Sequence, residues 1–109
     1  MKLLHSRYYK KILKKLTSKF PEIKEALIVS NEGMPLKSTL SQDIEHVKIA
    51  GIALAILSAA KKLISETKNG NFKQLSIKGS EGYLLGYWLN RNRLLLVVSS
   101  KEIALDSII

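Results

Sequence analysis

The first twenty residues combine apolar and basic positions with the period of an α-helix. Tyr8, Ile12 and Leu16 recur at every fourth position, and the neighbouring Tyr9 and Leu13 widen this apolar stripe. The other positions form a basic face made of Arg7, Lys10, Lys11, Lys14 and Lys15. Because proline has no backbone N–H to continue a helix, we expect this amphipathic helix to end at Pro21.

Short runs rich in β-branched residues follow the proline. They predict strands over residues 23–30 and 34–40, joined by a turn at residues 31–33 in which Gly33 supplies a positive φ. Pro35 has no backbone N–H to donate to a neighbouring strand, so the second strand suits the edge of a sheet.

A long helix is predicted over residues 44–67. Ser41 or Asp43 would cap its N-terminus, Glu45 lies favourably in its first turn, and Asn69 and Gly70 form a stop signal.

Three further strands are predicted over residues 72–78, 83–89 and 93–98, with tight turns between them. The last two carry large apolar residues on both faces and are expected to be central, whereas residues 72–78 resemble an edge strand. Ser99 and Glu102 have capping-box spacing, which predicts a short final helix from Lys101 that places Ile103 and Ile108 on the sheet. The element order is α-β-β-α-β-β-β-α, an α+β domain.

The segment 49–60 of the long helix has no polar face. A helix on one sheet needs only a stripe of about 100°, so a second side must be buried. We assign Ile52, Ile56 and Leu63 to the sheet. A seam of small residues, Gly51, Ala55 and Ala59, would then let the helix approach a second chain closely.

The edge strand would add Phe72, Leu75 and Ile77 to this dimer interface, because an unprotected edge tends to pair with its symmetry mate. The alternative is that the first or last helix of the same chain covers the apolar side.

Composition narrows the class of protein. The 109 residues fit a single domain, residues 1–109, and the absence of cysteine excludes disulfides and thiolate zinc sites. The longest apolar stretch would span only about 18 Å as a helix, against ~30 Å for a bilayer core. We therefore expect a cytoplasmic protein with no membrane span.

The formal net charge is +9, and seven of the eighteen basic residues lie among residues 1–19, where there is no acid. This basic face could meet an acidic protein, the phosphates of a nucleic acid or an anionic lipid surface, or could simply be solvated.

Two stretches resemble the Roadblock family of dynein-light-chain-like domains. Residues 21–36, and most specifically the run ALIVSNEGMP at residues 26–35, are similar to the family's opening hairpin. Residues 72–79, followed by Glu81, Gly82 and Tyr83, are similar to its third strand and turn. The resemblance extends from about residue 10 to residue 100.

The resemblance implies a five-stranded antiparallel sheet with the long helix on one face and the terminal helices on the other, dimerising through that helix and the third strand. It also implies a non-enzymatic dimeric scaffold for a Ras-like small GTPase. Bacterial members can stimulate GTP hydrolysis by ordering the partner's own catalytic residues. A heterodimer with a related Roadblock chain remains open. About ten residues follow the fifth strand here, so the last helix is expected to be short.

No motif assigns catalysis, a cofactor or a metal. Phosphate-binding glycine loops and a nucleophile elbow are absent, and His5 and His46 are too few for a metal cluster. Arg91 and Arg93, at an exposed turn, are either solvated or an arginine finger in trans. The alternative function is nucleic-acid binding through the basic first helix. Against it stand the scarcity of arginine and the expected burial of Tyr8 and Tyr9.

Overall fold

The computed structural model describes residues 2–107 and has the predicted order of elements. A first helix and hairpin precede the long helix, three strands follow it, and the last element within the described residues is a 3₁₀ turn where an α-helix was predicted. The elements are α1 (Lys2–Lys19), β1 (Ile23–Ser30), β2 (Pro35–Ser38), α2 (His46–Glu66), β3 (Leu75–Gly79), β4 (Gly82–Asn90), β5 (Arg93–Ser99) and η1 (Leu105–Ser107).

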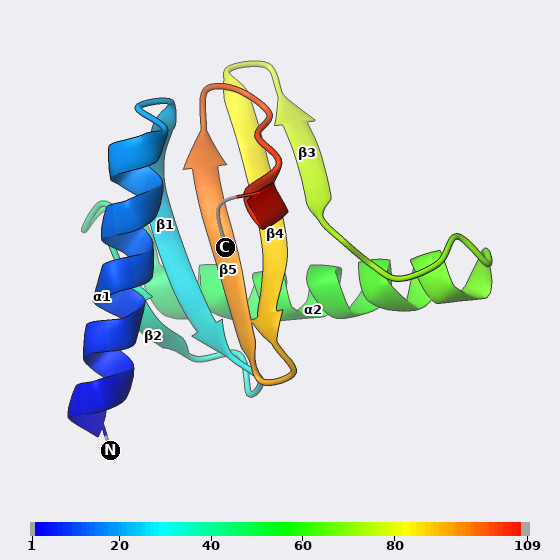
Figure 1. The fold of residues 1–109 in the computed structure, drawn as a ribbon, viewed down its shortest axis with the longest axis horizontal. Coiled ribbons are helices and arrows are strands. Elements are labelled where there is room, and N and C mark those ends of the chain that lie inside the picture. The colour runs from blue at the N-terminus through cyan, green and yellow to red at the C-terminus, as the bar shows by residue number, and fades with distance from the viewer. Residues whose placement is uncertain (1, 108–109) are drawn as a thin grey trace.

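The five strands form one antiparallel sheet in the order β2-β1-β5-β4-β3. The α1 helix and η1 lie on one face of this sheet, and α2 crosses the other face (Figure 1). The predicted fold class is therefore confirmed, with β2 and β3 at the edges and β4 and β5 inside. Gly33, in the turn between β1 and β2, has the expected positive φ of 82°.

Alternation along the strands divides the core into two layers. On the α1 side, the apolar stripe of the helix packs against inward residues of β1, β4 and β5. The fully buried residues of this layer include Leu16, Ile28, Leu85, Leu95 and Val97. On the α2 side, the layer contains Leu27, Val29, Leu94, Leu96 and the buried residues of α2. Each face of the sheet thus has its own helix and its own hydrophobic cluster.

The residues of α2 that face the sheet are not those predicted. Ala50, Ala53 and Leu57 are buried, whereas Ile52, Ile56 and Leu63 are 47%, 40% and 64% exposed. The assignment of these three large residues to the sheet is wrong because α2 approaches the sheet too closely to admit them.

Gly86 of β4 has no side chain and therefore allows α2 to approach the sheet closely. A Cβ added there would lie 2.8 Å from Leu57 Cδ1 and 3.1 Å from its Cγ, and Leu57 is only 1% exposed. A strand glycine is commonly found where another element comes near the backbone.

The capping predictions for α2 are also wrong. The N-cap is Glu45, which makes no side-chain capping bond, and Ser41 Oγ accepts a hydrogen bond from Asp43 N within the preceding turn. At the other end the helix stops at Glu66, and Lys68 and Gly70 both have positive φ, 55° and 80°. The predicted end of the helix at residue 67 is thus correct to within one residue.

The third strand begins later than predicted, at Leu75, and Phe72 lies in the loop before it. Gln74 in that loop holds the C-terminal segment: its Nε2 donates to Ile103 O, and its Oε1 accepts from Leu105 N, both at 2.8 Å.

The predicted capping box is wrong, since Ser99 ends β5 and its Oγ donates to Lys101 O at 2.7 Å. No α-helix forms over the described residues after β5; the 3₁₀ turn η1 takes its place. Ile103 is buried as expected, and Ile108 lies outside the described residues.

Gly86→Ala should lower the free energy of unfolding by about 1–3 kcal/mol, because the new methyl group would overpack Leu57. Urea unfolding followed by circular dichroism measures this. Gly79→Ala is the matched control on the neighbouring strand, where the added Cβ meets nothing closer than 3.4 Å. Equal stability of the two variants would contradict the proposed role of Gly86.

Candidate protein-interaction surface

An apolar groove runs between α2 and the outer strands of the sheet. It encloses about 80 Å³ and is lined almost entirely by apolar atoms. The residues that line it come from four elements and include Ile49, Ile52 and Ile56 of α2, Leu75 and Ile77 of β3, Leu84 of β4 and Leu96 of β5.

The rim of this groove is exposed to solvent. Besides the isoleucines and leucine of α2, Ile77 is 41% and Leu84 is 39% exposed. Contiguous apolar surface rimmed by polar residues is typical of protein interaction sites. We call the groove with its exposed lining residues, Ile52, Ile56, Ile77 and Leu84, together with the exposed Leu63 farther along α2, the apolar face.

The structure brings some of the predicted interface residues to this side of the molecule. Ala55 and Ala59 are exposed on α2, whereas Gly51, also exposed, lies beside the β1–β2 turn, where a Cβ added at Gly33 would be 3.6 Å from Gly51 Cα. Leu75 and Ile77 line the groove itself. Phe72 is half-buried in the loop and does not line it.

Sequence analysis missed Ile52, Ile56 and Leu84 as surface residues. The signal that could have found them is Gly86, because a glycine inside a strand predicts close packing. Close packing in turn requires alanines rather than isoleucines on the helix side facing the sheet.

The two edges of the sheet are unequal. The β3 strand pairs only with β4 along an unbroken register. The other edge, β2, contains Pro35, and its pairing with β1 shifts register between Ile28 and Val29. Proline and bulges protect an edge from further pairing, so β3 is the edge better suited to accept a strand.

The predicted basic face lies on the other side of the sheet. Arg7, Lys10, Lys11, Lys14 and Lys15 are all exposed on α1, away from the apolar face. Among the residues whose side chains the structure describes, none of these five takes part in an ion pair. Their charge is therefore not neutralised within residues 7–107.

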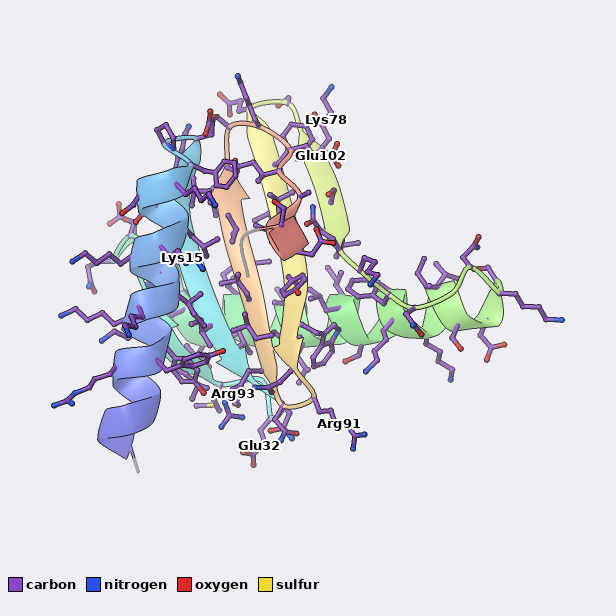
Figure 2. The ribbon with its side chains drawn as sticks, viewed as in Figure 1. Lys15, Glu32, Lys78, Arg91, Arg93 and Glu102 are labelled. Carbon is purple, nitrogen blue, oxygen red and sulfur yellow. The ribbon has the colours of Figure 1, made fainter. Side chains whose placement is uncertain are left out.

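A hydrogen bond ties the turn between β4 and β5 to α1. Arg93 Nε donates to Tyr9 Oη at 2.7 Å, and Arg93 Nη1 donates to Asn92 O at 2.8 Å. Figure 2 shows Arg91, Arg93 and Glu32 at this end of the sheet. Arg93 thus contacts the basic helix although it lies 84 positions after Tyr9 in the sequence, and Arg91 precedes it in the same turn.

The described side chains offer no group of three His, Asp or Glu residues that could hold a metal ion. Within the same part of the chain, neither α1 nor α2 is both long and apolar enough to cross a bilayer.

The sequence matches the Roadblock/LC7 domain over residues 9–99, from α1 to the end of β5. The chain belongs to the Roadblock/LC7 family. No curated protein matches the sequence significantly.

Solved Roadblock/LC7 structures share this fold at low sequence identity. MglB of Myxococcus xanthus is 16% identical with a TM-score of 0.74, over 91% of this chain and 79% of that one. A Roadblock/LC7 domain of Streptomyces avermitilis is 18% identical with a TM-score of 0.69, over 82% and 75% of the two chains. An MglB described with a tetrameric arrangement is 16% identical with a TM-score of 0.65, over 84% and 71%.

Tyr9→Phe removes the acceptor of Arg93 Nε and should lower the free energy of unfolding of this Roadblock/LC7 domain by about 0.5–1.5 kcal/mol. The measurement is a urea titration. Tyr8→Phe, at a 48% exposed position, is the control and should be neutral. A neutral Tyr9→Phe would show that this bond does not secure the turn to α1.

Proposed function

We propose that the protein is a non-enzymatic dimeric scaffold that binds a Ras-like small GTPase and stimulates its GTP hydrolysis. The observation that carries the proposal is the apolar face, which a single chain leaves in water. Roadblock/LC7 proteins are regulatory and adaptor proteins rather than enzymes, which supports the non-enzymatic part.

A dimer with a two-fold axis at the β3 edge would bury the apolar face of both chains. Antiparallel pairing of two β3 strands about an axis perpendicular to the sheet leaves both α2 helices on the same side of a continuous sheet. The two helices would then lie side by side, with Ala55 and Ala59 allowing close contact and Ile52, Ile56 and Ile77 filling the space between them.

The assembly of a relative supports oligomer formation, since one solved MglB has a tetrameric arrangement. A heterodimer with a related Roadblock chain would use the same surfaces. We take the homodimer as the working assembly because one chain supplies both an apolar helix face and a free edge.

The family implies the GTPase partner, and the charge indicates how it would be attracted. Two copies of the basic face would present Arg7, Lys10, Lys11, Lys14 and Lys15 twice on one assembly. Such a surface attracts an acidic partner and speeds association at low salt. We also propose a cytoplasmic location, because a partner of this kind would be found there.

Ala55→Glu should convert the dimer into a monomer. The position is exposed in the single chain, so the fold should tolerate the change, but each dimer would bury two unpaired carboxylates. We expect the dimer dissociation constant to rise by about 100-fold or more. Light scattering against the chain mass of 12.2 kDa measures the change.

Ser58→Glu adds the same charge at an exposed position of α2 outside the apolar face, and should leave the dimer intact. A stable dimer of Ala55→Glu, or loss of the dimer in both variants, would contradict this interface.

The partner proposal predicts that a Ras-like GTPase of the same organism binds the dimer in its GTP-analogue state more tightly than in its GDP state. Calorimetry measures binding, and phosphate release measures hydrolysis. Lys10→Glu combined with Lys14→Glu should weaken binding about tenfold at low salt. If none of the organism's purified Ras-like GTPases binds in either nucleotide state, the scaffold function is wrong, even if the dimer exists.

A further inference from the structure

A second hollow, distinct from the apolar groove, lies between α1 and the turn joining β4 to β5. It is open, has a volume of about 530 Å³ and is lined by Tyr8, Tyr9, Asn90, Arg91, Asn92 and Arg93. We call it the tyrosine–arginine groove. Its volume falls within the range of about 300–1,000 Å³ that is usual for ligand sites.

Arg93 is held in place in this groove. Its Nε donates to Tyr9 Oη and its Nη1 donates to the main chain of Asn92. Arg93 Nη2 makes no hydrogen bond to another described residue, so this fixed guanidinium can still donate to a ligand. A guanidinium held in one orientation loses little entropy when it binds a phosphate oxygen. Arg91, next along the turn, is exposed.

The aromatic wall has one buried and one accessible ring. Tyr9 is 6% exposed and belongs to the core, whereas Tyr8 is 48% exposed. The two ring centroids are 5.7 Å apart and the ring planes are tilted by 55°, so the buried Tyr9 ring contacts the Tyr8 ring. The expected burial of both tyrosines, which argued against nucleic-acid binding, is therefore wrong for Tyr8.

Positive charge continues from the groove along the helix. Tyr8, Lys11 and Lys15 have the i, i+3, i+7 spacing that places side chains on one flank of a helix. Figure 2 shows one acid, Glu32, at the same end of the sheet, and no ion pair joins it to Arg91 or Arg93.

We propose that the tyrosine–arginine groove binds single-stranded nucleic acid, with a base stacked on Tyr8 and the adjoining phosphates on Arg91, Arg93, Lys11 and Lys15. An exposed ring beside fixed cations is the combination that single-strand binding requires, because an unpaired base presents its face for stacking. An acidic peptide would use the cations but would leave the ring without a role.

This site shares Lys11 and Lys15 with the basic face proposed to attract the GTPase, but it does not overlap the proposed dimer surface. It lies on the α1 side of the sheet, opposite the apolar face, so dimerisation through α2 and β3 leaves it open on both chains.

Fluorescence anisotropy on the full chain tests the proposal. The probes are labelled oligo(dT) and oligo(U) of about 12 nucleotides, a length within the range one such module covers, the matching DNA duplex and a glutamate-rich peptide. We expect both single strands to bind more tightly than the duplex and the peptide. With four phosphate contacts, affinity should fall roughly 50-fold between 50 and 200 mM salt.

Variants separate stacking from bulk charge. Tyr8→Ala should weaken oligo(dT) binding at least about fivefold and Tyr8→Phe should preserve it. Arg91→Ala should weaken binding, whereas Lys62→Ala, which removes an equal charge from an exposed site on α2, should have no effect. Glu32→Gln should strengthen binding, because it removes a negative charge that repels the phosphates.

Absence of oligonucleotide binding at low salt would overturn the proposal, as would equal losses for Arg91→Ala and Lys62→Ala. Tighter binding of the duplex or of the acidic peptide would also overturn it. Circular dichroism of each variant confirms that the fold is retained. None of these outcomes depends on whether a GTPase binds.

Discussion

The contact between Leu57 and Gly86 decides which side of α2 faces water. Because β4 has no side chain at Gly86, Leu57 sinks onto the strand and brings the helix close to the sheet. Only alanines fit at Ala50 and Ala53 on the same side of the helix. The large isoleucines are displaced to the outer side, where they line a groove with β3. The apolar face thus follows from one missing Cβ.

The sheet then separates two kinds of surface. On the α2 side the accessible groups around the groove are almost entirely hydrocarbon, which attracts another apolar surface and is insensitive to salt. On the α1 side the accessible groups are cationic and lack acidic partners among the described residues, so their interactions depend on ionic strength. The proposed contact with a second copy and the proposed contact with an anionic partner would therefore depend on different forces.

Local pattern was enough to predict the fold. The strand at Ile23–Ser30 matches the predicted residues, and the order and edge positions of the strands follow from alternation and turn chemistry. What failed depends on contacts between distant segments. The rotation of α2 depends on Gly86, and the start of β3 depends on the hydrogen bonds of Gln74 to the C-terminal segment. Arg93 reaches Tyr9 only because the strands pair, since the two residues are 84 positions apart in the sequence.

The net charge of +9 has a different meaning once the fold is known. Counted along the sequence, its excess belongs to the first helix, and the two arginines near residue 92 look unrelated to it. The antiparallel return of β5 beside β1 brings that turn to the N-terminal half of α1, where Tyr9 fixes Arg93. Basic residues that are far apart in the sequence thus border one groove together with the exposed Tyr8 ring. Such a groove can discriminate among anions, which a row of solvated lysines alone cannot do.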